Sequence, residues 1–312
     1  MWKEKYFNML FPIDVEEFNY AHSLFLKYEN IPPLYRYREV NDRTIDSLKN
    51  DKVWLSSALE FNDPYDSGLT FNQEEIHFQK IKGDLLKEFC KKFNLDIEDV
   101  VSVTAGLSLD DTVTVLCRTI EANDQEAKNI RRVIQKVQEE TKDIYVKYVS
   151  DMNEIYQQRI FAACFSERPD SILMWSHYAK YHTGICIEYD FKELEHAHEI
   201  IQNLYPVKYT NELIDLEKYK GSRKHVNTLT LAATSKSNDW EYEKEWRLIY
   251  CKNNDSKPFY QKLMKPKHVI LGTKIKEDDK KKIIDVCKDR GISVKKAVLD
   301  RTKYQIHIVE YK

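Results

Sequence analysis

The sequence predicts an α+β protein whose core is a mixed, mainly antiparallel sheet with a helical insertion. Segments typical of strands gather in two parts of the chain, and the long segment between them has helical spacing and mixed charges. Strands and helices do not alternate regularly, as they do in a parallel βαβ sheet. We therefore expect an N-terminal helix in residues 1–30, a core domain formed by 31–71 and 159–312, and a helical insertion over 72–158.

The first elements follow from apolar spacing and from the residues that end each segment. Residues 13–29 have the spacing of an amphipathic helix, which two prolines end because proline lacks an amide hydrogen. LYRYREV after it is a short aromatic strand, and Asn41 or Asp42 caps a helix in RTIDSLKN. KVWLSS is a further strand. FNDPYD then forms a turn, because Asn-Asp-Pro favours loop conformations.

Most of the expected strands lie after the insertion. They are RIFAACFSE, GICIEYDF, YPVKYT, EWRLIYC, HVILGT, ISVKKAVLD and YQIHIVEY. Helices are expected in ILMWSHYAKYH, FKELEHAHEIIQN, HVNTLTLAATSKSND and KEDDKKKIIDVCKDR, the last of which Gly291 ends.

Charge and composition limit the classes of function. The net charge of −2 gives no global basic field for nucleic acid, which leaves only local patches. No apolar run is long enough for a signal peptide or a membrane span, so we expect a cytoplasmic protein without membrane contact. The six cysteines are scattered and lack the spacing of a zinc site, which indicates free thiols and predicts no metal site.

The segment WEYEKEWR carries three acidic residues at alternate positions. If it is extended, Glu241, Glu243 and Glu245 share one face, and their mutual repulsion raises the pKa of at least one carboxyl. A cation or a function is then expected beside them. The alternative is a solvated strand edge with the aromatic residues packed inward. We expect Glu245 at the rim of the core, where a catalytic carboxylate is useful.

The segment LYRYR, on a strand expected to adjoin WEYEKEWR, places Arg36 and Arg38 on one face and Tyr35 and Tyr37 on the other. The planar guanidinium of arginine matches phosphate and carboxylate groups. The alternative role is an ion pair between Arg36 and the glutamates. Both roles bring the two segments into one site.

Two further segments are expected to form the walls of that site. Asn62 and Asp63 suit a tight turn, and a structural role for this turn is as well supported as a catalytic one. Ser56 and Ser57 end the preceding strand and are candidates to face the same cleft. On a helix through WSHYAKYHTG, Tyr178 and His182 are neighbours at i,i+4, and Gly184 ends the helix. His177 is a candidate base or ligand contact there, whereas His182 is expected to be a core residue.

The order of these motifs resembles a bacterial family catalogued as a domain of unknown function. The matching elements are Arg36-Tyr37, Trp54 with Ser56 and FNDPYD, CFSERPDSILMWSHYAKYHTGICIEY, and Lys236 followed by WEYEKEWR. The same order of parts resembles an ADP-ribosyltransferase, although many transferases carry His-Gly or Arg-Gly where this chain has Arg36-Tyr37. This resemblance implies an ADP-ribosyltransferase-like fold with NAD as substrate.

Carried onto this chain, the resemblance implies roles for individual residues. Arg36 would bind the phosphates of NAD, Ser56 would support the nicotinamide ribose, and Glu245 would stabilise an oxocarbenium-like transition state. Glu243 would orient the acceptor. The expected contacts of the dinucleotide are Arg36, Tyr37, Asn62, Asp63, Trp175, His177 and Tyr178.

The sequence therefore predicts an NAD-dependent ADP-ribosyltransferase-like effector that modifies a protein or a nucleic acid, in keeping with the phage-defence context of the resembled family. One alternative is a non-enzymatic module that senses or binds a ligand. A second alternative is a metal-dependent nuclease in which Asp63, Asp66 and the glutamates bind Mg²⁺. The helical insertion is a candidate site for a partner protein.

Overall fold

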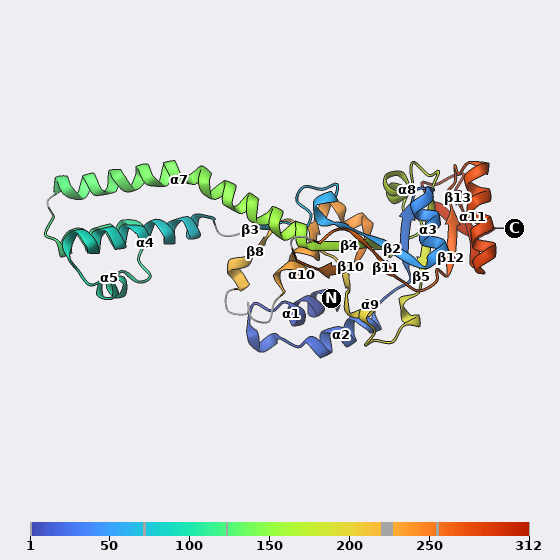
Figure 1. Cartoon of the computed structure of the whole chain (residues 1–312), viewed down its shortest axis with the longest axis horizontal. Helices are drawn as coiled ribbons and strands as arrows, with labels where there is room; N and C mark the ends of the chain where they lie inside the picture. The colour runs from blue at the N-terminus through green and yellow to red at the C-terminus, as the bar shows by residue number, and fades with distance from the viewer. Residues whose placement is uncertain (1, 71–72, 123, 220–226, 254–255, 312) are drawn as a thin grey trace. The chain divides into compact units, whose positions relative to one another are not determined.

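The computed structural model describes residues 2–70, 73–122, 124–219, 227–253 and 256–311 (Figure 1). The chain divides into two compact units. Unit 1 comprises Met1–Leu69, Glu154–Ile214 and Lys218–Lys312, and unit 2 comprises Thr70–Asn153 and Asp215–Glu217. The boundary that the sequence suggested, between residues 71 and 72, lies outside the described residues.

Unit 2 is built from the helices of the expected insertion. These are α4 Gln73–Phe93, α5 Ile97–Thr104, α6 Leu109–Thr119 and α7 Asp124–Arg159, of which the part from Glu154 onward belongs to unit 1. Asp96 and Ser108 cap the amino ends of α5 and α6 with their side chains. Apolar residues of α4, α5 and α6, such as Phe89, Val100 and Leu116, pack into a small core of this unit.

Unit 1 contains a ten-stranded sheet in the described part of the chain. Its strands are β1 Leu34–Arg38, β2 Lys52–Ser57, β4 Ile160–Ser166, β5 Ile185–Tyr189, β6 Leu204–Pro206, β10 Glu245–Cys251, β11 Phe259–Lys262, β12 His268–Leu271, β13 Ser293–Leu299 and β14 Ile306–Glu310. The path runs β11-β2-β4-β1-β5-β12-β13-β14, and β10 pairs with β4 and β6. Among the described strand pairs of this sheet, only β12–β13 is parallel. The predicted α+β class with a mainly antiparallel sheet is therefore confirmed.

The sheet splits beside β4, and this split positions the site. One edge of β4 pairs with β10 along its whole length. The other edge pairs with β2 at Phe161 and Ala162 and with β1 only at Ser166. Between those points β1 and β2 diverge. The split therefore opens a gap beside β4, where side chains from both faces of the sheet can meet.

Further helices and short strands lie outside the sheet of unit 1 in the chain (Figure 1). The α-helices are α1 Trp2–Leu10, α2 Tyr20–Glu29, α3 Asp42–Asn50, α8 Ile172–Tyr178, α9 Glu199–Gln202, α10 Thr228–Ala233 and α11 Glu277–Arg290. The 3-10 helices are η1 Val15–Glu17, η2 Ala58–Glu60, η3 Phe191–Glu193, η4 Leu216–Tyr219 and η5 Asn238–Glu243. The short strands are β3 Leu69–Thr70, β7 Lys208–Thr210, β8 Ile214–Asp215 and β9 Ser235–Ser237. Of these elements, β3, β8 and η4 contain residues of unit 2 as well as of unit 1.

The main core lies between the sheet and these helices. It joins residues of β1, β4, β5, β10 and α11, among them Leu34, Phe165, Trp246 and Ile283. The predicted caps are present, because Asn41 accepts a hydrogen bond from the amide of Thr44 at 2.9 Å. Gly291 ends α11 at a φ of 61°, a conformation that glycine adopts without steric cost.

Several predicted helices are wrong in extent. The helix expected over 13–29 is divided into η1 and α2, because Asn19 caps α2 and starts it at Tyr20. FKELEHAHEIIQN contains only η3 and the four-residue α9. In HVNTLTLAATSKSND, α10 is followed by strand β9, and residues 225–226 lie outside the described part.

The helix expected through WSHYAKYHTG is also too long. α8 ends at Tyr178, and Lys180, Tyr181 and His182 then adopt left-handed conformations. Tyr178 and His182 are therefore not helical neighbours. Gly184 does not end the helix but lets β5 pass close to β1, since a Cβ atom there would clash with the carbonyl oxygen of Arg38.

In the described part of the chain, no helix combines the length and the apolar character that a membrane span needs.

Candidate functional site

A cavity of about 410 Å³ opens in unit 1 at the gap beside β4. Its size falls within the range of small-molecule sites. The lining comes from β1, β2, β4, β9, β10, α8, η5 and the segment after β2. The residues are Tyr35, Arg36, Tyr37, Arg38, Ser56, Glu60, Phe61, Asn62, Asp66, Ala162, Cys164, Phe165, Met174, His177, Tyr178, Lys236, Glu243, Glu245 and Arg247.

Arg247 is the centre of a buried acidic cluster, which we define as Asp66, Lys236, Glu243, Glu245 and Arg247. Its guanidinium binds Asp66 twice, with Nη1 2.7 Å from Oδ1 and Nη2 2.6 Å from Oδ2. It also binds Glu245, with Nε 2.8 Å from Oε1 and Nη2 2.9 Å from Oε2. Nη1 donates in addition to the carbonyl of Ala233 at 2.9 Å. All five N–H donors of this guanidinium are therefore occupied.

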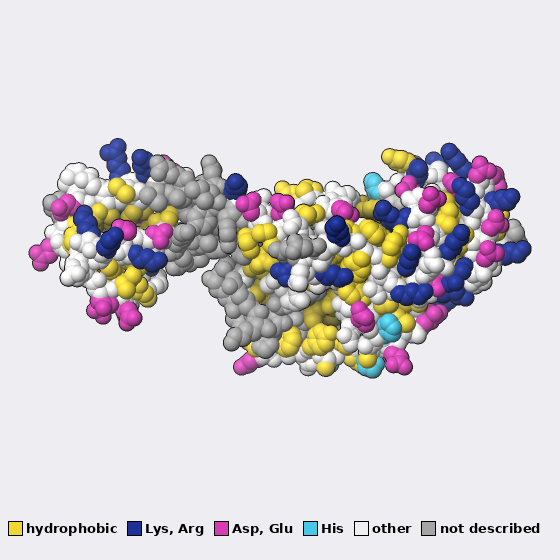
Figure 2. Space-filling model, viewed as in Figure 1, with side chains coloured by type: hydrophobic (Ala, Val, Ile, Leu, Met, Phe, Trp, Pro, Cys, Tyr) yellow, Lys and Arg dark blue, Asp and Glu magenta, His cyan; other side chains and the backbone are white. Residues whose placement is uncertain are grey.

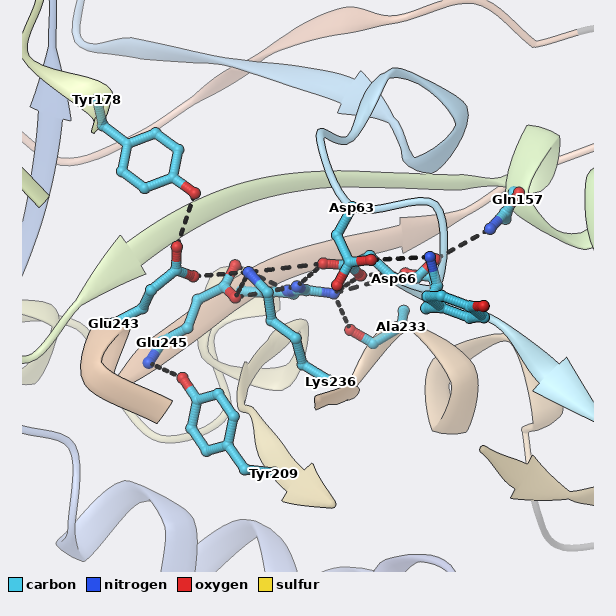
Figure 3. Close-up of polar contacts among 12 residues, drawn as sticks. Asp63, Asp66, Gln157, Tyr178, Tyr209, Ala233, Lys236, Glu243 and Glu245 are labelled. Atoms are coloured by element: carbon cyan, nitrogen blue, oxygen red, sulfur yellow. Dashed lines mark hydrogen bonds and ion pairs between the residues drawn. The ribbon is translucent and has the colours of Figure 1, made fainter. Parts of the chain in front are cut away.

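Lys236 is the second cation of the cluster. Its Nζ atom lies 2.6 Å from Oε2 of Glu243, 3.1 Å from Oε2 of Glu245 and 3.6 Å from Oδ2 of Asp66. The hydroxyl of Tyr178 donates to the other oxygen of Glu243 at 2.6 Å. Figure 3 shows Tyr178 and Tyr209 approaching the two glutamates from opposite sides. Three carboxylates therefore share two cations.

A left-handed residue brings the two glutamates together. η5 ends at Glu243, Lys244 turns the chain at a φ of 46°, and β10 begins at Glu245. The extended conformation expected for WEYEKEWR, with Glu241, Glu243 and Glu245 on one face, is therefore wrong. Glu241 is exposed and pairs with Lys244 at 2.8 Å. The carbonyl of Glu243 accepts from Ser166 at 2.6 Å, and the amide of Glu245 donates to the hydroxyl of Tyr209 at 2.7 Å, which fixes both sides of the turn.

The two glutamates have opposite pKa shifts. Burial raises the pKa of Glu243, and the charge of Glu245 raises it further, although Lys236 acts against both. Burial also acts to raise the pKa of Glu245, but the charges of Arg247 and Lys236 lower it well below its ordinary value. Glu243 is therefore the better proton acceptor of the two, and Glu245 is held as a carboxylate.

Arg36 and Arg38, which we call the arginine pair, reach the cavity at the gap between β1 and β2. Nη2 of Arg36 donates to the carbonyl of Trp54 on β2 at 3.0 Å. Its Nη1 atom is buried and has no hydrogen-bond partner among the described residues. Burial, together with the charge of Arg38, lowers the pKa of Arg36 to about 10, which leaves it charged at neutral pH. Neither arginine forms an ion pair within the described part of the chain.

The strand register places the arginine pair and the acidic cluster on different faces of the sheet. Tyr35 lies opposite Ser166, and Ser166 lies opposite Glu245, so Tyr35 and Glu245 share a face and Arg36 has the other. The alternation expected within LYRYR is confirmed. The alternative ion pair between Arg36 and the glutamates is absent from the described contacts, because Lys236 and Arg247 occupy these carboxylates. The expectation that LYRYR and WEYEKEWR adjoin is wrong, since β4 lies between β1 and β10.

Most of the residues singled out in the sequence line the cavity. They are Arg36, Tyr37, Ser56, Asn62, His177, Tyr178, Glu243 and Glu245. Trp175 does not, because it is fully buried and its Nε1 donates to the carbonyl of Pro169 at 2.8 Å. Asp63 does not either, since its carboxylate accepts from the amide of Tyr65 at 2.9 Å and shapes the turn.

Asp66, Lys236 and Arg247 were not among the residues expected in a transferase site. Arg247 carried a physical signal, because it stands in the apolar strand EWRLIY and a cation buried there needs a carboxylate partner. Asp66 carried no such signal, since its partner Arg247 is distant in sequence. Lys236 precedes Glu243 and Glu245 by only a few residues, but apolar spacing does not show that the chain folds back to pair them. Among the described residues, no group of three or more His, Cys, Asp and Glu side chains is arranged to hold a metal ion.

Comparisons with known proteins give one match. Neither the curated proteins nor the solved structures include a match to this chain. Residues 174–248, which contain α8 from Met174 onward, Lys236 and both glutamates of the cluster, match the model of a family described as "Protein of unknown function (DUF2971)".

Proposed function

We propose that the cavity binds NAD and that the protein transfers ADP-ribose from it to a protein or a nucleic acid. One observation carries this proposal: a cavity of nucleotide-binding size has, among the described residues, an arginine pair without counter-ions at one side and a buried acidic cluster at the other. The unpaired arginines match the pyrophosphate of a dinucleotide. The acidic side matches the positive charge of the nicotinamide ring and of the transition state.

The aromatic lining supports a dinucleotide rather than a simple anion. Tyr35, Phe61, His177 and Tyr178 offer ring faces and edges for the base and the nicotinamide. Ser56, at the end of β2, is positioned to bind a ribose hydroxyl. Arg36 would hold a phosphate through Nη1, the nitrogen that lacks a partner among the described residues.

The reaction needs one bond broken and one formed. The bond between C1′ of the ribose and the ring nitrogen of nicotinamide breaks, and its electron pair leaves with nicotinamide, whose ring becomes neutral. The acceptor nucleophile forms the new bond to C1′, and Glu243 takes the proton that this nucleophile loses. Glu243 suits this role because its pKa is raised. We assign Glu245 a positioning role, because cations bind both of its oxygens, whereas one oxygen of Glu243 binds the neutral hydroxyl of Tyr178.

The test is incubation of the full chain with NAD labelled in the adenylate and, separately, in the nicotinamide. We expect release of nicotinamide and labelling of the protein or of an added acceptor. The Glu243→Gln variant should lose at least about 100-fold in rate, in the range of a lost general base. The Arg43→Met variant is a matched control, since Arg43 stacks on Trp54 outside the cavity lining. A folded wild-type protein that neither cleaves NAD nor transfers label to a broad set of acceptors would contradict the proposal.

A second candidate function is a non-enzymatic module that binds a nucleotide as a signal. The pairing of Glu245 with both Lys236 and Arg247 favours this function, because a buried ion-pair network can be purely structural. Calorimetric titration with ADP-ribose and NAD separates the two functions. Binding that Arg36→Met weakens, together with no turnover, supports the binding module, whereas turnover supports the transferase.

A further inference from the structure

The C-terminal part of unit 1 has a positive net charge, although the net charge of the whole chain is slightly negative. Residues 257–311 contain fifteen Lys and Arg residues against seven Asp and Glu residues, although the complete chain has a net charge of −2. Figure 2 shows Lys and Arg side chains gathered over α11 and β13, with fewer acidic ones among them. Local basic surface of this kind attracts phosphate backbones.

A rigid loop presents two of these cations together with an aromatic ring. Asp300 accepts hydrogen bonds from the amides of Thr302 and Lys303 at 2.7 and 2.9 Å, and its other oxygen lies 2.9 Å from Nε2 of His307. The charge of Asp300 is therefore used inside the loop. Arg301 and Lys303 remain exposed, and the side chain of Tyr304 has 102% of its reference area in contact with solvent. A fully exposed tyrosine on a loop held by hydrogen bonds can stack with an unpaired nucleobase.

This loop borders a second cavity, of about 510 Å³, which we call the C-terminal cavity. The rest of its lining is formed by Ile172, His182, Thr273 and Lys274. The left-handed turn at His182 is held in place because the amide of Lys274 donates to the carbonyl of His182 at 3.0 Å. Gly272 allows this contact, since a Cβ atom there would clash with the same carbonyl. The cavity is thus built by specific backbone contacts.

Two polar atoms at the C-terminal cavity have no partner among the described residues. They are Nδ1 of His182 and Oγ1 of Thr273, both buried. The hydroxyl of Ser176 lies 2.9 Å from the carbonyl of Ile172 and 3.1 Å from Nε2 of His182. When it donates to the carbonyl, it accepts from Nε2 of His182. Nδ1 of a neutral His182 is then an acceptor that needs a donor. The amino groups of nucleobases and the hydroxyls of ribose are such donors.

We propose that the C-terminal cavity and its loop bind single-stranded nucleic acid. A base stacks on Tyr304, the backbone phosphates contact Arg301, Lys303 and Lys274, and a base or sugar donor binds His182 and Thr273. A single strand fits better than a duplex, because stacking on an exposed ring requires an unpaired base. This site stands independently of the NAD proposal, although α8 contributes to both cavities through Tyr178 and Ile172.

The test is fluorescence anisotropy of the full chain with labelled 12-nucleotide DNA and RNA strands at several salt concentrations. We expect Tyr304→Ala to weaken binding about tenfold, in line with the loss of one stacked base. The double variant Arg301→Ala/Lys303→Ala should reduce the slope of log K against log salt by about 0.7 for each phosphate that no longer binds a cation. Unlabelled AMP should compete only weakly if an extended strand is the ligand.

Matched controls keep the measurement specific. Tyr65→Ala removes another exposed tyrosine, and Lys91→Ala/Lys128→Ala removes two exposed cations of unit 2. Both should bind like the wild type. The proposal is overturned if no strand binds at low salt, if the Tyr304 and Arg301/Lys303 variants bind as the wild type does, or if only vesicles containing phosphatidylserine bind.

Discussion

The acidic cluster and the arginine pair contribute buried charges to one cavity in opposite ways. In the acidic cluster, every carboxylate has a cation within 3.1 Å, and Arg247 uses all its donors. In the arginine pair, Arg36 keeps an unpartnered Nη1, and neither arginine has a carboxylate partner among the described residues. The charges of the acidic cluster are all paired within the protein, so this cluster stabilises the fold. The arginine pair keeps an unpartnered donor, as expected of a group that binds a ligand.

The largest expected effect is on stability, from Arg247→Met. This change leaves Asp66 and Glu245 buried without their cation, so the free energy of unfolding should fall by about 3–5 kcal/mol. Urea denaturation measures it. Arg36→Met is the matched control from the arginine pair. It should change stability by only about 1 kcal/mol, because Arg36 loses a single hydrogen bond. Equal losses in the two variants would remove the distinction between the two sets of charges.

The next largest effect is on ligand binding, where Arg36→Met should have a large effect although its effect on stability is small. Arg36→Met should weaken the binding of ADP-ribose by roughly ten- to a hundredfold, the range of a lost charge-assisted hydrogen bond. The measurement is calorimetric titration under conditions where the variant is folded. Arg43→Met, whose guanidinium stacks on Trp54 at 4.9 Å, should bind as the wild type does. Unchanged affinity in Arg36→Met would show that the arginine pair is structural.

The two glutamates should also give opposite dependences of stability on pH. The folded-state pKa of Glu243 is raised above its ordinary value of 4.5, so above pH 4.5 the folded protein holds more protons than the unfolded chain. Its contribution to stability therefore falls as pH rises through that window. The folded-state pKa of Glu245 is lowered, so its contribution is present above pH 4.5 and is lost as pH falls below it.

Denaturation of Glu243→Gln and Glu245→Gln across a range of about pH 3–7, which brackets the ordinary carboxyl pKa, measures these contributions. Relative to the wild type, Glu243→Gln should gain stability as pH rises above 4.5, whereas Glu245→Gln should lose it as pH rises toward 4.5. One proton changes the free energy of unfolding by at most about 1.4 kcal/mol per pH unit. Slopes of the same sign in the two variants would mean that the proton is not held mainly by Glu243.

The sequence predicted the fold class and most strands, because these depend on local patterns of apolar residues. RIFAACFSE and EWRLIYC are apolar runs of strand length, and they form the paired strands β4 and β10. Helix lengths were less predictable. Asn19 and Lys180 interrupt segments with helical spacing, the first by capping and the second by a left-handed conformation. The cap at Asn19 is a local hydrogen bond from the amide of His22, whereas the left-handed turn is held by a contact with Lys274, and apolar spacing shows neither.

The site was predictable in its members but not in how they pair. Glu243 and Glu245 stood out as alternating acids, yet their closeness depends on Lys244 and not on an extended strand. Arg36 was a candidate to neutralise them, but β4 lies between β1 and β10. The cations that do so come from Lys236 on β9 and Arg247 on β10. Only the pairings of Arg247 and Lys236 with Asp66 join segments that are remote in sequence. The pairings of Lys236 and Arg247 with the glutamates join residues close in sequence, but they depend on how β9, η5 and β10 fold against one another, which apolar spacing does not show.

The smallest effect concerns the turn that makes the acidic cluster possible. Lys244 has a φ of 46°, where a side chain with a branched Cβ is strongly disfavoured. Lys244→Val should therefore lower the free energy of unfolding by about 1–2 kcal/mol. Lys244→Gly relieves the turn but gains freedom in the unfolded chain, so it should stay within about 1 kcal/mol of the wild type. Because Glu243 and Glu245 reach Lys236 only through this turn, Lys244→Val should also shift the pH dependence of stability, whereas Lys244→Gly should preserve it.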